Sequence, residues 1–123
     1  MNAKARFEER IWELSEQATE DCAAFEPPEE PPAPERAMTY LRQGAGPAVS
    51  IYVEARTGRH MIHFPPDEYH ALEGTMNAYL DLYGACYGAD IQPQFTIRKA
   101  AELLIDTHNI KDVAQILTGI PDR

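Results

Sequence analysis

The stretch PDEYHALEGTMNAYLDLYGACY, residues 66–87, decides the fold. Its apolar residues recur at intervals of three and four, which places them on one face of an α-helix. These residues are Tyr69, Leu72, Met76, Tyr79, Leu80, Tyr83, Cys86 and Tyr87. Pro66 suits the first helical position, and Asp67 and Glu68 complement the positive end of the helix dipole. The sequence therefore predicts a long central helix on which the rest of the chain packs.

The residues before this helix predict a β-hairpin. Val49, Ile51 and Val53 alternate with their neighbours in the pattern of a strand that has one buried face. Residues 56–59 read Arg-Thr-Gly-Arg and are typical of a hairpin loop. Residues 60–64 then form the return strand, which Pro65 and Pro66 end.

Three further helices are expected. Residues 3–25 place Phe7, Ile11, Leu14, Ala18, Cys22 and Phe25 on one face and charged residues elsewhere. Such an amphipathic helix needs a surface to cover its apolar stripe. Thr96 and Asn109 precede two short helices, residues 97–107 and 110–117, and their side chains suit helix capping.

Two segments are expected to interrupt regular structure. Residues 26–36, EPPEEPPAPER, hold five prolines, which remove backbone donors and favour an extended spacer. Residues 37–43 read as a short helical turn, which GAGP at residues 44–47 should end.

These elements predict an α+β fold that is mostly helical. One short antiparallel β-hairpin packs with the long central helix and two C-terminal helices, and an N-terminal amphipathic helix is tethered to them. The corresponding domain organisation is an acidic helix at 1–25, a proline- and glutamate-rich linker at 26–36, and a compact domain at 37–123.

The charge of the chain restricts its partners. Eleven Lys and Arg oppose twenty Asp and Glu in 123 residues, and the formal net charge is −9. Residues 1–36 hold ten acids against four bases, which is two thirds of that net charge. Such a chain repels nucleic-acid phosphates and anionic membranes at long range, so the sequence disfavours both as direct partners.

Location follows from what the sequence lacks. Cys22 and Cys86 form no CxxC motif, and the N-terminal residues have no apolar core of a signal peptide. No apolar run approaches the roughly 20 residues that a membrane span needs. We therefore expect a cytoplasmic protein with reduced thiols.

The leading functional hypothesis is a non-enzymatic protein–protein interaction module without a cofactor. One version is an acidic regulator or inhibitor of a basic or nucleic-acid-binding partner, because carboxylates can stand where phosphates would bind. The residues predicted to contact the partner are Trp12, Tyr79, Tyr83, Tyr87, Arg56 and Arg59. We also expect a homodimer with its contact along the central helix, since a two-stranded hairpin covers little of that helix.

Two alternatives remain open. His63, Asp67 and His70 could converge at the start of the central helix as metal ligands of a small enzyme, with Arg56 or Arg59 holding an anion. Residues 97–117 resemble the two helices of a helix-turn-helix DNA reader, but residues 95–123 hold four bases and four acids. A DNA-binding surface normally has a basic surplus.

Overall fold

The structure, a computed structural model, describes residues 3–58 and 61–122. Every regular element in these two ranges is a helix, and none is a strand. The predicted α+β class, with its antiparallel β-hairpin, is therefore wrong. No helix in the described part of the chain is long and apolar enough to cross a bilayer. The elements in chain order are α1 (Ala3–Ala24), α2 (Pro34–Tyr40), the π-helix η1 (Leu41–Ala45), α3 (Gly46–Thr57), α4 (Pro66–Cys86), α5 (Ile97–Thr107) and α6 (Ile110–Thr118).

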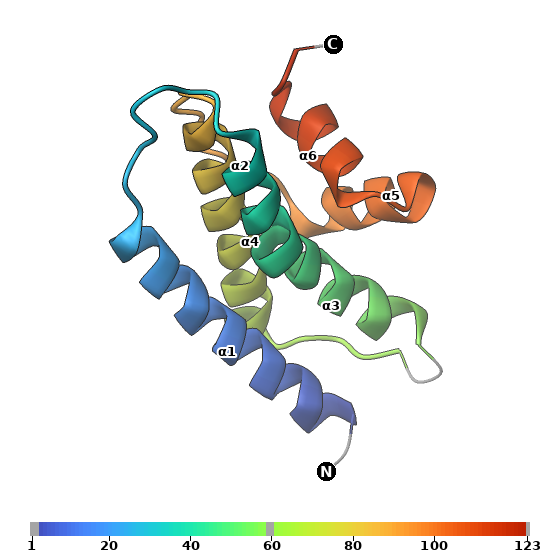
Figure 1. The fold of residues 1–123 in the computed structure, drawn as a ribbon. Helices are drawn as coiled ribbons and strands as arrows, with labels where there is room; N and C mark the ends of the chain where they lie inside the picture. Colours follow the sequence, from blue (N-terminus) through green and yellow to red (C-terminus); the bar gives the residue numbers. More distant parts are fainter. Residues whose placement is uncertain (1–2, 59–60, 123) are drawn as a thin grey trace.

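Helix α4 is the centre of the fold, which confirms the prediction from its apolar stripe. It contacts each of the other helices. Helix α1 lies beside α4 and runs in the same direction, whereas α2, η1 and α3 follow one another in the opposite direction (Figure 1). The α5–α6 pair packs on α3 and η1, away from α1. The surface between α1 and α4 is therefore not covered by the C-terminal helices.

The buried face of α4 follows the helical spacing read from the sequence. Tyr69 and Tyr87, at the two ends of the stripe, are half-buried. Full burial of a large apolar side chain contributes about 1.5–3 kcal/mol, so this stripe is a major source of stability. The residues that are at most 1% exposed are Leu72, Met76, Tyr79, Leu80, Tyr83 and Cys86.

Residues 46–57, predicted as a strand and part of a turn, form helix α3 instead. Ala48, Tyr52 and Ala55 are buried, and their spacing of four and three is helical. A half-buried strand would bury alternate residues only. The alternation of β-branched residues at 49, 51 and 53 is therefore a coincidence: Val49 and Ile51 are buried on the helix, whereas Val53 is half-buried.

The predicted hairpin loop and return strand are also corrected. Helix α3 ends at Thr57, and residues 61–65 reach α4 without regular structure. The backbone N–H of Ile62 donates to the carbonyl of Ala55 at 2.9 Å, so the chain folds back on the end of α3. Arg59 and His60 lie outside the described residues.

The GAGP motif at residues 44–47 does not end the helix that precedes it. The helix widens into the π-turn η1 and continues as α3. Pro47 lies in the first turn of α3, where a missing N–H is tolerated. The carbonyl of Gln43, four residues before this proline, accepts a hydrogen bond from Gln17 Nε2 on α1 at 2.9 Å. A side chain from another helix thus replaces the donor that Pro47 lacks.

The proline-rich segment lies across the C-terminal end of α4. The backbone N–H of Ala33 donates to the carbonyl of Cys86 at 2.7 Å. Arg36 Nη2 donates to the carbonyl of Glu26 at 2.8 Å. Helix α2 begins at Pro34, inside the stretch expected to be extended, because the φ angle of proline suits a first helical turn.

Both C-terminal helices and their caps are confirmed. The Thr96 hydroxyl accepts a hydrogen bond from Lys99 N at 3.1 Å. Asn109 Oδ1 accepts one from Lys111 N at 2.9 Å. Gly119 ends α6 in the left-handed conformation, with φ of 71°. These caps fix where α5 begins and where α6 begins and ends.

Candidate protein-binding surface

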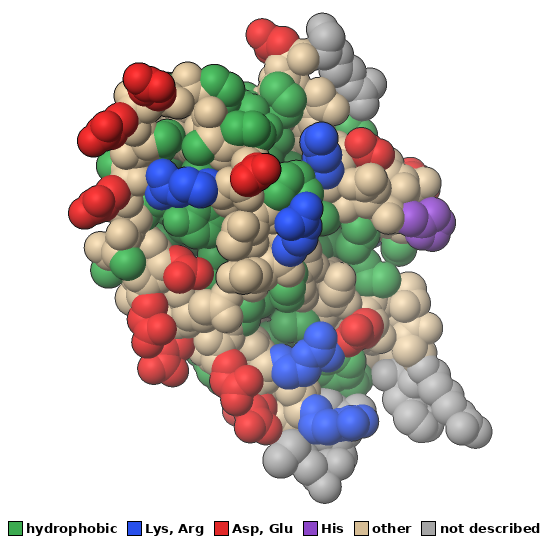
Figure 2. Space-filling model, in the orientation of Figure 1, with side chains coloured by type: hydrophobic (Ala, Val, Ile, Leu, Met, Phe, Trp, Pro, Cys, Tyr) green, Lys and Arg blue, Asp and Glu red, His purple; other side chains and the backbone are tan. Residues whose placement is uncertain are grey.

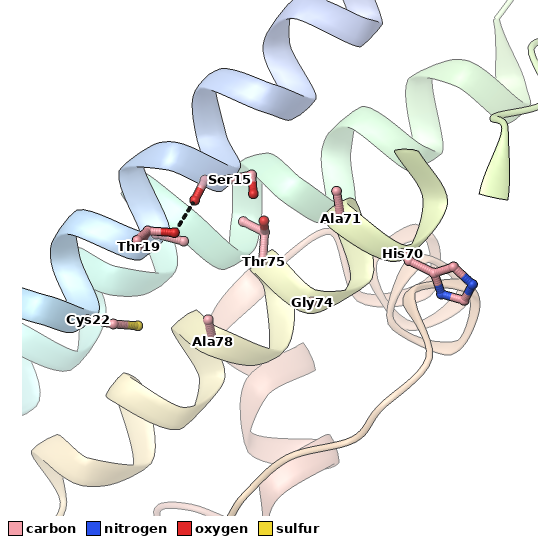
Figure 3. A pocket seen from close by; sticks show the side chains of 9 residues that line it. Ser15, Thr19, Cys22, His70, Ala71, Gly74, Thr75 and Ala78 are labelled. Carbon is pink, nitrogen blue, oxygen red and sulfur yellow. Dashed lines mark hydrogen bonds between the residues drawn. The ribbon is translucent and has the colours of Figure 1, made fainter. Parts of the chain in front are cut away.

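A groove runs along the surface between α1 and α4. Figure 3 shows short side chains from both helices facing the gap between them. The groove has a volume of about 430 Å³. Its lining residues are Ser15, Ala18, Thr19, Cys22, His70, Ala71, Gly74, Thr75 and Ala78.

The groove exists because both helices carry small residues along the line where they meet. Gly74 is exposed, and no atom lies within 4 Å of the position that a Cβ would take. Thr75 is buried between the two helices. The Thr19 hydroxyl donates to the carbonyl of Ser15 at 3.2 Å, so this polar group is satisfied within α1 (Figure 3). The walls are therefore made of mostly small side chains, and the Thr19 hydroxyl among them already has a hydrogen-bond partner.

Negative charge reaches the groove from both helices. Partial burial, Asp81 on α4 and Asp21 on α1 together raise the pKa of the Cys22 thiol. A thiol with a raised pKa is a poor nucleophile, because the thiolate is the reactive form. We therefore treat Cys22 as a wall residue of the groove.

The outward face of α1 is acidic. Glu9, Glu13, Glu16 and Glu20 follow one another at intervals of four, three and four, and all are exposed. Figure 2 shows acidic side chains gathered over α1 and over the segment that follows it. Trp12 lies on the same helix and is 43% exposed. An exposed indole within a row of carboxylates is the most distinctive surface feature of α1.

Tyr79 of α4 holds α1 in place. Its hydroxyl donates to Asp21 Oδ2 at 2.6 Å and accepts a hydrogen bond from Gln17 Nε2 at 2.8 Å. Burial and the hydrogen bond to Asp21 raise the pKa of Tyr79, so the phenol stays protonated and keeps donating. The Tyr79 ring lies directly on the backbone of Gly44 in η1, where a Cβ would overlap the ring carbons. The sequence pattern did not reveal this network, because the bonded residues are 58 and 62 positions apart.

The tyrosines predicted to contact a partner are mostly core residues. Tyr79 and Tyr83 are fully buried, and the Tyr83 hydroxyl donates to the carbonyl of Ile120 at 2.6 Å. Tyr87 is half-buried, with its ring centroid 5.3 Å from that of Tyr83. We therefore leave these three residues out of the candidate surface.

The remaining predicted residues lie on different elements. Trp12 on α1 and Arg56 on α3 are both exposed. The Arg56 guanidinium lies 5.8 Å from the centroid of the Tyr52 ring. Arg59 is outside the described residues, so the structure does not bring the two predicted arginines together at a hairpin tip.

The two alternative sites gain no supporting geometry. His63, Asp67 and His70 are all exposed, and residues 3–58 and 61–122 contain no group of three His, Cys, Asp or Glu that could hold a metal ion. Helices α5 and α6 do form the helix pair predicted at residues 97–117. Their balanced charge still lacks the basic surplus of a DNA-binding surface.

A buried carboxyl that the sequence did not single out lies in the first turn of α4. Glu68 is 6% exposed, and within the described residues its Oε1 has no hydrogen-bond partner. Burial, followed by the charges of Glu8 and Asp67, raises its pKa, and Lys4 opposes this effect. The N-terminal half of α1 therefore packs beside a carboxyl whose charged form the fold disfavours.

Replacing Glu68 with glutamine keeps a polar side chain at this position but removes the charge that burial disfavours. The free energy of unfolding near neutral pH is expected to rise by roughly 1 kcal/mol, since each unit by which the fold raises a pKa costs about 1.4 kcal/mol once the group is charged. Because the folded state raises the pKa, this cost is absent below the unfolded pKa of about 4.3, grows as pH rises from there, and is complete above the folded value. Thermal melts of both proteins across this pH range measure the difference, which should vanish in acid.

Glu102→Gln is the matched control, because it makes the same chemical change at an exposed position of α5, away from Glu68. It should change the free energy of unfolding by no more than about 0.5 kcal/mol. A gain in stability for both variants would mean that net charge, and not the burial of Glu68, determines the result.

Comparison with known proteins gives one family match. The model of the family described as "Domain of unknown function (DUF8055)" matches residues 5–122. No curated protein and no solved structure matches the chain. The matched range includes both walls of the groove and the acidic face of α1.

Proposed function

The chain belongs to the family described as "Domain of unknown function (DUF8055)", and we propose that it is a non-enzymatic protein–protein interaction module that binds a basic partner through the outward face of α1. The observation that supports this function is Trp12, which is 43% exposed among a row of glutamates. Tryptophan is among the residues that most often dominate binding energy at interfaces.

The neighbours of Trp12 specify the charge of the partner. Two glutamates precede it on the helix, Glu8 by four positions and Glu9 by three, and Glu16 follows it by four. Residues at these spacings share one side of a helix. The face of an indole attracts a Lys or Arg cation by about 0.5–2 kcal/mol. Carboxylates around the ring add direct charge complementarity, which also raises the rate of association. A surface rich in Lys and Arg satisfies both requirements.

In its more specific form, this module is a regulator or inhibitor of a nucleic-acid-binding protein. Such a partner holds phosphates with Lys and Arg, and the row of carboxylates on α1 offers the same sign of charge on a rigid helix. The contact takes place in the cytoplasm, in line with the reduced thiols expected from the sequence.

The proposal does not need a second copy of the chain. The predicted homodimer rested on helix stripes that lacked cover, but α1 packs on α4 within one chain. Ile11, Leu14 and Ala18 of α1 are buried in that contact. The homodimer stays a prediction, which sedimentation at micromolar concentration tests.

Two fourfold variants test the proposed function, and both change the net charge by the same amount. The test variant carries Glu9→Gln, Glu13→Gln, Glu16→Gln and Glu20→Gln. The control carries Glu26→Gln, Glu29→Gln, Glu30→Gln and Glu35→Gln, which are exposed positions outside α1. The unaltered chain and the control should capture the same proteins from the native host, and these proteins should be basic. The test variant should bind them on the order of tenfold more weakly.

Trp12→Ala should give a comparable loss without any change in charge. Binding that survives both the α1 variant and Trp12→Ala would contradict the proposal. An equal loss in the two fourfold variants would show that only the total charge of the chain is recognised.

A further inference from the structure

We propose that the groove between α1 and α4 is the docking site for one amphipathic helix of the basic partner. The helix would place aliphatic side chains in the groove and Lys or Arg along its flanks. This inference rests on the proposed function, because it names the part of the basic partner that binds and the place where it binds.

The groove has the dimensions of a helix-binding site. Its walls extend from Ser15 to Cys22 and from His70 to Ala78, which is about two helical turns on each side. Its volume of about 430 Å³ is large enough for several side chains of a bound segment, since small-molecule pockets begin at about 300 Å³. Helices that bind in grooves do so through side chains spaced three or four residues apart. Such side chains would enter where the small walls leave space, above all at Gly74.

The large apolar side chains on the inner face of α1 pack in the core and do not line the groove. Ile11 and Leu14 face inward and are buried. On the outer side, Trp12 precedes Ser15 by three residues, and Thr19 and Cys22 continue at four and three. Residues at this spacing share one side of a helix. Trp12 therefore extends the α1 wall by one turn, and a helix in the groove would also cover the indole.

Carboxylates select the occupant of the groove. The charges of Asp21 and Asp81 already reach Cys22 on its wall. Glu16 and Asp67, both exposed, stand beside the wall residues of α1 and α4. A second copy of the chain would bring the same carboxylates against them, and like charges at an interface repel. A helix with Lys or Arg on its flanks neutralises them, so charge complementarity favours the basic partner over a second copy.

The test uses the full-length protein and two synthetic peptides of identical composition. One peptide places leucines at i, i+4, i+7 and i+11 with lysines on both flanks; the other has the same residues in an order that breaks this spacing. Trp12 fluorescence and backbone amide NMR shifts report binding. The first peptide should bind about tenfold more tightly than the second and should shift the amides of Ser15, Thr19, Gly74 and Ala78.

Gly74→Leu fills the groove from within, and the open space at this position lets the fold accept the side chain. This variant should abolish the preference between the two peptides. Ala24→Leu is the control, since it adds a similar side chain at an exposed position of α1 outside the groove lining. It should leave the preference unchanged.

The other outcomes separate this inference from the proposed function. If both peptides bind equally and only the Glu9, Glu13, Glu16 and Glu20 variant weakens them, the acidic face binds basic partners but the groove does not hold a helix. If neither peptide binds, both ideas fail. If the protein self-associates and Gly74→Leu prevents this, the occupant is a second copy and the inference is wrong.

Discussion

Replacing Gly44 with alanine is expected to lower the free energy of unfolding by about 1–3 kcal/mol, the range for forcing extra atoms into a packed core. Alanine is the better helix former by about 1 kcal/mol, so helix propensity alone predicts the opposite sign. Packing should prevail because the added Cβ would overlap the Tyr79 ring. That ring cannot simply move away, since Asp21 and Gln17 hold its hydroxyl.

Gly74→Ala is the matched control, because it makes the same chemical change in a helix where the Cβ meets nothing within 4 Å. It should stabilise the protein by about 0.5–1 kcal/mol, which is the propensity term without the clash. Urea melts of the two variants measure both values. If Gly44→Ala is as stable as Gly74→Ala, the close contact between η1 and α4 is not formed in solution.

Replacing Met76 with aspartate is expected to have an effect at least as large. Met76 is 1% exposed at the middle of the buried face of α4. Burying a carboxylate without a partner costs several kcal/mol or forces the group to take up a proton. A domain of this size has about 5–15 kcal/mol of stability in total, so Met76→Asp should leave much of the protein unfolded near neutral pH.

Gly74→Asp serves as its control, because it adds the same charge at an exposed position two residues away. Asn77→Asp, which adds the same charge one residue after Met76, is unsuitable. The Asn77 side chain donates to the carbonyl of Phe95 at 2.9 Å and accepts from its N–H at 3.0 Å, and aspartate would lose the donor. Circular dichroism melts should separate Met76→Asp from Gly74→Asp by many degrees. Similar melting temperatures would show that this face of α4 is not buried.

The helices that could be predicted from the sequence are those whose signals are local. The stripe of residues 66–87 gives α4, and Thr96 and Asn109 begin α5 and α6 as expected. In each case the spacing of apolar residues and the capping chemistry operate within a few positions of the chain. Local rules are sufficient when local interactions determine where an element begins and ends.

The prediction of a β-hairpin was wrong because contacts with distant residues outweigh the local sequence pattern that suggested a turn and a strand. Gly44 and Pro47 normally interrupt a helix. Here Gly44 admits the Tyr79 ring, and Gln17 donates to the Gln43 carbonyl that Pro47 leaves without its usual partner. The same residues that suggested a turn therefore allow a continuous helical path against α1 and α4. Nothing in residues 44–53 alone indicates this.

The candidate surface also has one part that the sequence reveals and one part that it does not. Trp12 and the acidic residues of α1 could be identified from composition and spacing. The groove could not, because it depends on α1 lying parallel to α4 with small residues facing small residues. The tyrosines were assigned to a partner because an aromatic stripe has the same sequence pattern whether it faces the core or another protein. Only burial distinguishes the two.

The hydrogen bonds that fix α1 to Tyr79 span 58 and 62 positions of the chain. Closing a loop of this length carries an entropic penalty that the local α5–α6 pair does not have. Docking of α1 is therefore expected to be a late event in folding, and its release an early event in unfolding. One wall of the groove is thus made by a helix that is expected to dock late and to be released early. A ligand seated between α1 and α4 would hold that part closed, so its binding and the local stability of α1 are thermodynamically linked.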